Sequence, residues 1–389
     1  MPTDRGSQAR LIASARLDRQ RKMRLMISDD LKLDYGDVLI VPGRSPVASR
    51  KQVELAVDTD FRGHIMRYQG VPIMAANMDG VGTMEMADAL REYGVFSCLT
   101  KFYQARELID FFTSDPSRSA FSAMTIGIGD DDWNKFAAVN ARAGDLLAYA
   151  CLDVANGYTD RFVGCVEKFR DLYPDKILIA GNVVTPEQTV RLIDAGADIV
   201  KVGIGGGSVC ETRIKTGIGF PQFSAVLECA RAAHEDGGRI VADGGCTTPG
   251  DVAKALAAGA DFVMLGGMFA GHKEGGGRIV DRFFSGEEVT EGGELVIEKH
   301  QYVEFYGMSS KTANDKHFGG LKDYRSSEGR TVLLRLKPSL SDSIHDLLGG
   351  LRSACSYVGA ESLNEISQKA RFVRCSNTHN RIFEEMALE

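Results

Sequence analysis

TPEQTVRLIDAGADIV (residues 185–200) and TPGDVAKALAAGADFVML (residues 248–265) are the two stretches that decide the fold. Each opens with a threonine suited to cap a helix and a proline suited to the first helical position, and continues as a short helix. Each then passes through Ala-Gly-Ala-Asp into an apolar run. The same unit of cap, helix, turn and strand occurs twice, which predicts a chain built from repeated strand–helix units.

Apolar runs of strand length recur through the middle of the chain. They are continuous rather than alternating, as expected for parallel strands that are covered on both faces. Eight runs are predicted as strands: 71–77, 95–100, 123–129, 146–153, 177–182, 199–203, 239–245 and 262–267. Helical patterns lie between them, including residues 84–94 and 105–115. Eight such repeats predict an α/β fold of the (β/α)8 TIM-barrel type, with a doubly wound open sheet as the alternative.

The remaining segments surround this predicted barrel. We expect residues 26–389 to form a single (β/α)8 catalytic domain, preceded by an N-terminal extension, residues 1–25. The extension is rich in arginine, and we expect it to be disordered, with a transit peptide as the alternative. The C-terminal stretch 341–360 predicts a helix packed on the body, because four apolar residues fall on one helical face. They are Ile344, Leu347, Leu348 and Leu351.

Residues 268–335 break the strand–helix rhythm and predict a long irregular insert. Such an insert in a compact domain is more often a mobile flap over a site than a simple connector. It contains an acidic stretch with Glu287, Glu288, Glu291, Glu294 and Glu298.

The overall composition narrows the functional classes. The chain has 389 residues and a net charge of -7, which argues against a general nucleic-acid partner. No apolar run is long enough to span a membrane. The eight cysteines include no Cys-x-x-Cys pair and no zinc spacing. We therefore expect reduced thiols in a cytoplasmic protein.

Glycine pairs follow the last two predicted strands. They are Gly244-Gly245, directly after Asp243, and Gly266-Gly267. Backbone amides bared by glycine can bind phosphate oxygens, and barrels often hold phosphate at these two strand ends. Asp243 could accept hydrogen bonds from ribose hydroxyl groups. Glycines that merely close tight turns are the alternative for either pair alone.

The loop GIGGGSVCETR (203–213) follows the sixth predicted strand. It fails as a dinucleotide fingerprint, because Ser208 stands where the last glycine is required. The glycines instead allow the loop to curl, so that its carbonyl groups could hold a monovalent cation. Cys210 lies in this polar loop beside Arg213, which favours a reactive thiol over a buried structural one. Glu328, in YRSSEGR (324–330), could act as a general acid or base.

Long and specific motifs make the chain recognisable from about Met26 onward. They are DLKLDYGDVLIVPGRSPVASR, VPIMAANMD, CLDVANGY, AGNVVT, KVGIGGGSVCETRIKTGIGFPQ, DGGCTTPGDVAKALAAGADFVMLGGMFAG, YGMSS, YRSSEGR and GGLRSACSYVGA. With them the chain resembles the inosine-monophosphate dehydrogenase / guanosine-monophosphate reductase family. The reductase branch is the closer one, because there is no room for the regulatory domains that the dehydrogenases normally carry within the barrel.

The resemblance implies a reductive deamination of GMP by NADPH, which yields IMP, ammonia and NADP+. Cys210 would attack purine carbon C2 and form a thioimidate, and Thr212 and Glu328 would handle the proton for the departing amine. The family forms homotetramers, and its members bind potassium.

Residue by residue, the resemblance implies three further sets of contacts. GMP would meet Ser208, Asp243, Gly244, Gly245, Gly266, Gly267, Met308, Ser309, Arg325, Ser327 and Gly329. NADPH would meet Lys101, Asp153, Val154 and Ala155, with Ser49, Arg50, Tyr324 and Ser353 contributed across a subunit boundary. K+ would lie on Gly205, Gly207, Cys210 and Arg213.

The chain departs from the family pattern at three positions near the predicted site. Gly206 replaces a proline, Glu211 replaces a threonine, and Phe102 stands where relatives show a histidine. A carboxylate beside the nucleophile disfavours the thiolate if it points inward, so Glu211 bears on the reaction rate.

Three other functions compete with a reductase. The first is an IMP dehydrogenase that oxidises IMP with NAD+. The second is a purine-nucleotide sensor without turnover, which Glu211 motivates. The third is a flavin- or phosphosugar-binding barrel, which the phosphate-binding glycines alone would permit.

Overall fold

The computed structural model describes residues 28–289, 295–337 and 339–376, without the side chains of 285–289 and 295–296. The described residues from 33 onward form one compact unit, and residues 28–32 belong to another. In the latter unit, residues 28–32 contain neither helix nor strand, and the predicted extension, residues 1–25, lies outside the described residues. In the part of the chain that the structure describes, no helix is long and apolar enough to cross a membrane.

Eight parallel strands close into a barrel, so the predicted TIM barrel is confirmed and the open sheet is excluded. The closing pair is β10 with β3, in the register Val263↔Ile73. A ninth strand, β2 (Val57–Asp60), pairs antiparallel with β3 outside the closed ring. All eight predicted strands are present: β3 (Arg67–Ala75), β4 (Val95–Leu99), β5 (Ser122–Ile126), β6 (Tyr149–Asp153), β7 (Ile177–Val183), β8 (Ile199–Val202), β9 (Arg239–Asp243) and β10 (Phe262–Leu265).

Aromatic side chains pack together near the amino ends of the barrel strands. The ring of Tyr68, at the start of β3, makes edge-to-face contacts with Phe96 and Phe262, with centroids 6.0 and 5.2 Å apart. Phe96 in turn contacts Tyr149, with centroids 5.0 Å apart. Edge-to-face aromatic pairs add stability beyond the area that they bury. The amino ends of these strands thus form packed core, and the carboxyl ends are left to carry the site.

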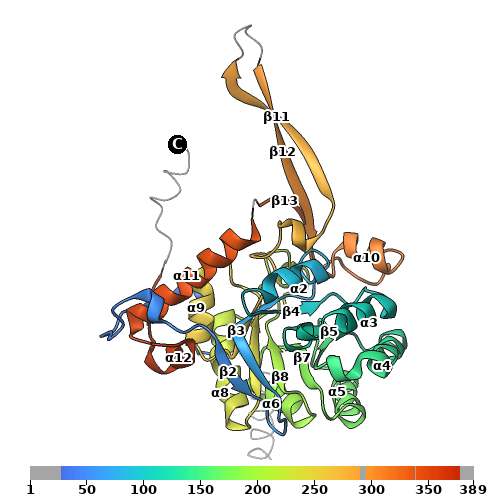
Figure 1. Ribbon diagram of the computed structural model, residues 1–389, viewed down its shortest axis with the longest axis vertical. Helices are drawn as coiled ribbons and strands as arrows, with labels where there is room; N and C mark the ends of the chain where they lie inside the picture. The colour runs from blue at the N-terminus through green and yellow to red at the C-terminus, as the bar shows by residue number, and fades with distance from the viewer. Residues whose placement is uncertain (1–27, 290–294, 338, 377–389) are drawn as a thin grey trace, which may run out of the picture. The chain divides into compact units, whose positions relative to one another are not determined.

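Helices form a ring around the barrel, as Figure 1 shows. They are α2 (Met84–Arg91), α3 (Ala105–Ser114), α4 (Asp130–Ala143), α5 (Asp160–Leu172), α6 (Pro186–Asp194), α8 (Gln222–Glu235) and α9 (Pro249–Ala257). The two threonines that were predicted as helix caps, Thr185 and Thr248, differ in their hydrogen bonds. Thr248 Oγ1 accepts a hydrogen bond from the amide of Asp251, 3.3 Å away, whereas Thr185 occupies its cap position without a capping bond. The hydroxyl of Thr185 instead accepts from Tyr158, at 3.2 Å.

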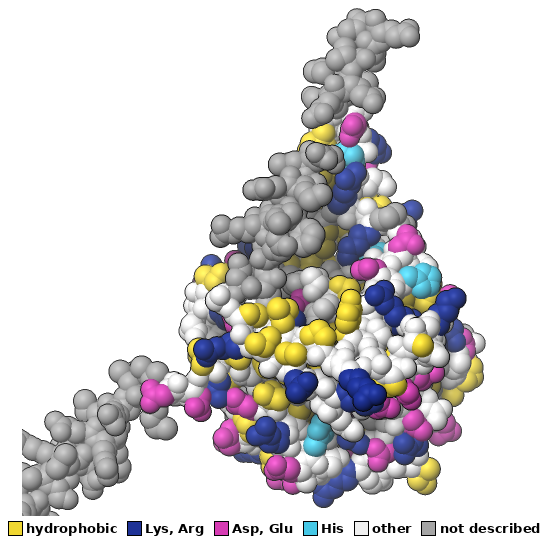
Figure 2. All heavy atoms as spheres, turned by 90° about the vertical axis from the view of Figure 1, so that its left-hand side faces the viewer, with side chains coloured by type: hydrophobic (Ala, Val, Ile, Leu, Met, Phe, Trp, Pro, Cys, Tyr) yellow, Lys and Arg dark blue, Asp and Glu magenta, His cyan; other side chains and the backbone are white. Residues whose placement is uncertain are grey.

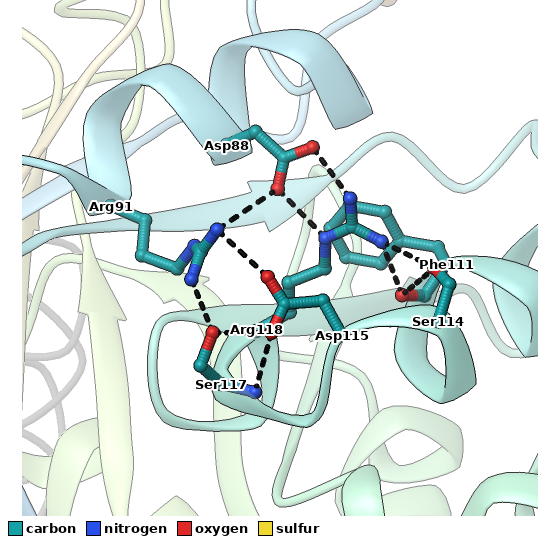
Figure 3. Close-up of polar contacts among 7 residues, drawn as sticks. All are labelled: Asp88, Arg91, Phe111, Ser114, Asp115, Ser117 and Arg118. Atoms are coloured by element: carbon teal, nitrogen blue, oxygen red, sulfur yellow. Dashed lines mark hydrogen bonds and ion pairs between the residues drawn. The ribbon is translucent and has the colours of Figure 1, made fainter.

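A polar cluster on the outside of the barrel joins α2 to α3 and the turn that follows it (Figure 3). Arg118 forms a bidentate pair with Asp88, at 2.7 and 2.8 Å. Arg91 reaches Asp115 at 2.9 Å, and the guanidinium of Arg118 lies 4.3 Å from the ring centroid of Phe111. The four charged side chains are partly exposed, so each ion pair contributes about 1 kcal/mol or less. These ion pairs hold α2 against the turn that follows α3.

The C-terminal part packs on the body as predicted. Helix α11 (Leu340–Val358) buries Ile344, Leu347, Leu348 and Leu351. It approaches α9 closely, because a Cβ at Gly350 would lie 2.6 Å from that of Pro249. After α12 (Ile366–Lys369), strand β14 (Arg371–Arg374) pairs antiparallel with β1 (Val38–Val41). Figure 2 shows charges of both signs interspersed with hydrophobic side chains on the face drawn there.

The predicted irregular insert is instead largely regular, so that expectation was wrong. It contains a long antiparallel hairpin, β11 (Ile279–Val289) with β12 (Leu295–Tyr306), extended by β13 (Thr331–Arg335). Figure 1 shows the hairpin reaching away from the barrel. Helix α10 (Lys311–His317) follows β12. Of the acidic stretch, Glu287, Glu288 and Glu298 lie in these strands, and Glu291 and Glu294 lie outside the described residues.

Candidate active site

Two loops at the carboxyl ends of the strands lie backbone against backbone. The loop after β8 begins at Gly203, where φ is +153° and an added Cβ would lie 1.9 Å from the carbonyl oxygen of Asp243. In the loop after β9, Gly244 has φ of +93°, and an added Cβ would lie 3.3 Å from the amide nitrogen of Gly207. Only glycine fits such an approach without strain, so part of the glycine richness serves to pack the two loops together.

The predicted catalytic residues form a hydrogen-bonded chain. The thiol of Cys210 donates to Thr212 Oγ1 at 3.3 Å, and that hydroxyl donates to Glu328 Oε2 at 3.0 Å. Thr212 and Glu328 are separated by 116 residues in the sequence. Backbone pairing holds them together, because the amide of Glu211 donates to the carbonyl of Glu328 at 2.7 Å. A proton can move between thiol and carboxylate along this chain.

Two of the predicted substrate residues, Ser208 and Gly267, meet next to a cavity whose lining does not include Cys210, Thr212 or Glu328. A Cβ at Gly267 would lie 2.6 Å from Ser208 Oγ, so the loops after β8 and β10 meet there. Beside them opens a cavity of about 450 Å³, bounded in part by Phe305 and by Leu347 of α11. This volume is in the range of small-molecule sites.

The remaining predicted substrate residues lie in the segment between β12 and β13 and at neighbouring strand ends. Ser327 Oγ donates to the carbonyl of Gly329 at 3.0 Å, and the carbonyl of Ser309 accepts from the amide of Glu328 at 3.2 Å. Met308 is half-buried, and Arg325 is exposed. Gly266 approaches the sulfur of Met78, since an added Cβ would lie 3.0 Å from it, and Gly245 lies against Tyr35 and Gln222.

A buried lysine that sequence reasoning missed lies among the strand ends. The side chain of Lys201 on β8 is 2% exposed and forms an ion pair with Asp153. A second carboxylate, Asp243, lies 3.4 Å away. Amides complete the cluster: Asn77 lies 3.2 Å from Lys201, and Asn182 donates to Asp243 at 2.8 Å.

The charges in this cluster stabilise one another. Burial alone would raise the pKa of Asp153, but attraction to Lys201 outweighs it and holds that pKa below its usual value. Burial alone would lower the pKa of Lys201, but Asp153 and Asp243 raise it well above the ordinary lysine value. The sequence carried one signal for this cluster, the lysine inside the apolar run IVKV. A buried ammonium group requires partners of opposite charge.

The predicted cofactor residues fall into two groups. Lys101 lies two residues after the end of β4, and its charge contributes to the low pKa of Asp153 at the end of β6. Val154 pairs with β7 through Gly181, at 2.9 Å, and Ala155 is exposed. The other group was predicted to act across a subunit boundary. Ser49 caps a short 3₁₀ turn at Arg50 that packs on α11, the helix that carries Ser353, and Tyr324 is 87% exposed.

The predicted cation residues offer backbone oxygens. The carbonyl of Gly207 accepts from the amide of Cys210 at 3.0 Å. An added Cβ at Gly205 would lie 2.6 Å from Arg213 Cγ. The guanidinium of Arg213 is held by Asp34 at 3.2 Å and by the carbonyl of Phe220 at 2.6 Å. Over the described ranges, no cluster of three His, Cys, Asp or Glu side chains could hold a metal ion.

Comparison with known proteins gives the family to which the chain is similar. The family model described as IMP dehydrogenase / GMP reductase domain matches residues 32–382. A protein of Vibrio vulnificus named GMP reductase is 48% identical over 360 residues, which cover 92% of this chain and 99% of the relative. A GMP reductase of Klebsiella pneumoniae is 49% identical over 361 residues, and one of Aliivibrio fischeri is 46% identical over 360, with the same coverage.

Proposed function

The chain belongs to the IMP dehydrogenase / GMP reductase family, and on that premise we propose that it is a GMP reductase. It would convert GMP to IMP and ammonia with consumption of NADPH. The observation that carries the proposal is the chain of hydrogen bonds from Cys210 through Thr212 to Glu328. A thiol that attacks a purine and a carboxylate that exchanges protons with the leaving amine are what this reaction requires.

The same hydrogen-bonded chain serves two steps. As Cys210 Sγ adds to C2 of GMP, its proton passes through the Thr212 hydroxyl to Glu328. The proton then returns through Thr212 to the amino group at C2, because ammonia leaves readily only when that nitrogen is protonated. The C2–N bond breaks and the C2–S thioimidate remains.

The second half of the reaction reduces that thioimidate. NADPH, when bound, supplies a hydride to C2. The C2–S bond then breaks, the thiolate of Cys210 takes up a proton, and IMP is released. The thiol is thereby regenerated, while GMP, NADPH and protons from solvent are converted to IMP, ammonium and NADP+.

Recognition of GMP is proposed for the residues around the loops after β8, β9 and β10. Ser208, Gly244, Gly245 and Gly267 offer a hydroxyl group and backbone amides suited to a phosphate. The carboxylate of Asp243, positioned by Asn182, would accept from ribose hydroxyl groups. Contacts to the base and ribose are proposed for Gly266, Met308, Ser309, Arg325, Ser327 and Gly329.

The NADPH proposal rests on Lys101 and Asp153. The charge of Lys101 helps to lower the pKa of Asp153, and the exposed residue Ala155 leaves room for a ligand. A cationic side chain beside exposed backbone at the carboxyl ends of two strands fits a dinucleotide. We propose a homotetramer in the cytoplasm, in which Ser49, Arg50, Tyr324 and Ser353 contact the cofactor across a subunit boundary.

The donor set in the loop after β8 fits K+ rather than a transition metal. Backbone carbonyls at Gly205, Gly207 and Cys210 would hold the ion, since hard oxygen donors suit hard cations. Arg213 would contribute only its carbonyl, because its guanidinium is engaged elsewhere. The ion would fix the loop that carries Cys210.

A direct assay tests the proposed function. Purified protein is mixed with GMP, K+ and NADPH, and the loss of NADPH is followed together with the gain of ammonia. We expect equal amounts of both, and IMP as the purine product. Parallel reactions contain NADH in place of NADPH, Na+ in place of K+, and IMP with NAD+. Turnover only in the last of these would support the dehydrogenase, and loss of NADPH without ammonia would contradict the thioimidate route.

A further inference from the structure

A buried carboxylate outside the catalytic chain joins three parts of the molecule. Asp79 follows β3, and its side chain is 7% exposed. It accepts hydrogen bonds from Tyr306, at the end of β12, and from Thr100, at the end of β4, at 2.7 and 3.1 Å. From α10 it receives His317 Nε2 and, at 3.2 Å, Lys316. Burial alone would raise the pKa of Asp79, but the bonds from His317 and Tyr306 bring it below the usual value.

An aromatic stack lies on the other side of His317. Its imidazole is parallel to the ring of Phe102, with centroids 3.4 Å apart and 5° between the planes. Phe318 meets Phe102 edge-on at 5.9 Å. His317 therefore has one fixed orientation, because Asp79 holds its nitrogen and Phe102 holds its face.

The stack faces Lys101. The ammonium of Lys101 lies 5.6 Å from the ring centroid of Phe102 and 5.8 Å from that of Phe318. Both distances are within the range of cation–π attraction. The position of Lys101 thus depends on two rings, and one of those rings is held by α10.

The same α10 segment is hydrogen-bonded to the loop before β13 that carries Glu328. The amide of Lys311, the first residue of α10, donates to Ser327 Oγ at 3.1 Å. Just before it, the carbonyl of Ser309 accepts from the amide of Glu328. Any shift of α10 is therefore transmitted to Glu328 as well as to Lys101.

We propose that Asp79, Phe102, His317 and Phe318 form a positioning clamp that sets Lys101 and the Glu328 segment through α10. The clamp residues are positioning residues and do not take part in the chemistry. The proposal rests on the proposed function, because it assigns cofactor binding to Lys101. The clamp also gives a role to Phe102, because its ring packs on the imidazole that is bonded to Asp79.

Two variants separate the stack from the hydrogen bond. Phe102→Leu keeps an apolar side chain but removes the stack, and His317→Phe keeps the stack but removes the bond to Asp79. Phe102→His restores a flat ring and is the conservative rescue. The matched control is His345→Leu on α11, since His345 also meets an aromatic ring, that of Tyr93, edge-on at 5.6 Å.

Hydrogen exchange of the α10 amides tests the clamp without reference to catalysis. Loss of the aromatic pair should make exchange over residues 311–317 about three- to tenfold faster in Phe102→Leu. Loss of the hydrogen bond to Asp79 should have an effect of about the same size in His317→Phe. Phe102→His and His345→Leu should match the wild type. Unchanged exchange in both stack and bond variants would overturn the proposal.

Steady-state kinetics then test the link to Lys101. We expect the KM for NADPH to rise by about three- to tenfold in Phe102→Leu, while the KM for GMP stays within about twofold. Equal rises in both constants, or a loosened α10 with an unchanged KM for NADPH, would overturn the link. If the wild type consumes no NADPH with GMP, the proposed function fails. In that case, a fluorescence titration with NADPH tests the clamp. A higher Kd for NADPH in Phe102→Leu than in the wild type supports it. No binding of NADPH to the wild type refutes the link between the clamp and cofactor binding at Lys101.

Discussion

Two glycine-rich loops of the barrel end in a cysteine, and only the cysteine of the first loop is hydrogen-bonded to a chain that leads to a carboxylate. Cys210 follows β8 in the sequence Cys-Glu-Thr-Arg, and Cys246 follows β9 in the sequence Cys-Thr-Thr-Pro. Both thus have a threonine two residues later. Thr212 donates to Glu328, whereas the hydroxyl of Thr248 accepts from an amide at the start of α9. The threonine thus bonds a carboxylate in one loop, where we propose proton transfer, and caps a helix in the other.

The surroundings of the two thiols also differ. Cys210 donates to Thr212 and has an acid at the far end of the chain. Cys246 lies near Tyr35, whose hydroxyl group is buried, and burial raises the pKa of the Cys246 thiol well above its ordinary value. Glycine before a cysteine therefore does not make a nucleophile. What distinguishes Cys210, the proposed nucleophile, is the proton acceptor that is connected to its thiol through Thr212.

Replacement of each cysteine by alanine should give the largest difference in kcat between the two loops. Cys210→Ala should lower kcat by about ten-thousand-fold or more, because no other group can form the thioimidate. It should leave GMP binding nearly intact, as measured by calorimetry. Cys246→Ala should keep kcat within about threefold of the wild type. Deamination of GMP by Cys210→Ala would show that the reaction is not covalent.

Neutralising the acid should give the next largest effect. Glu328→Gln keeps the size of the side chain but cannot take the proton from Thr212, so kcat should fall by about a hundredfold. Rapid-quench measurements should show that ammonia release slows more than hydride transfer. In the other loop, Asp251→Asn beside Thr248 should lower the melting temperature and leave kcat almost unchanged. If Glu328→Gln slows both steps equally, its assigned role in deamination is wrong.

Alkylation at different pH values compares the thiols directly. An ordinary thiol has a pKa of about 8.5, and only the thiolate reacts. Since the pKa of Cys246 is raised, its thiolate population appears only at higher pH. At pH 8.5 iodoacetamide should therefore modify Cys246 about tenfold or more slowly than Cys210, with the gap closing as the pH rises. Peptide mass spectrometry measures both rates, and protein unfolded in urea should show no difference. Equal rates of alkylation in the folded protein would show that the thiols of Cys210 and Cys246 do not differ in reactivity.

The fold could be predicted because its signals are local. Continuous apolar runs marked all eight barrel strands, and the threonine–proline starts marked α6 and α9. The hairpin of β11 and β12 was missed, although LVIEKHQYVEFY carries some of the alternation of a two-sided strand. The glycine and acidic residues that surround this stretch are typical of loops and predict an irregular segment instead.

The site was only partly predictable, because its contacts join distant residues. Periodicity cannot show that Thr212 meets Glu328, and this pair came from the family resemblance alone. Lys201 could have been suspected, since a lysine inside an apolar strand needs a counter-charge. Its partners Asp153 and Asp243 could not have been named from the sequence, as they become neighbours only when the barrel closes. The contact of His317 with Phe102 depends in the same way on where α10 docks.

The smallest expected effect comes from Glu211, the residue that most distinguishes this nucleophile loop from its family pattern. Its amide fixes the carbonyl of Glu328, and any side chain can supply that amide. Its half-buried carboxylate adds negative charge beside a thiol that must become a thiolate, which opposes the reaction. Glu211→Thr should therefore raise kcat about two- to fivefold, since a partly exposed charge pair is worth about 0.5–1 kcal/mol. The gain should shrink at high salt, which screens such interactions. Glu211→Gln separates charge from shape, because it should give the same gain. A lower kcat in both variants would mean that the carboxylate assists the thiol rather than opposing it.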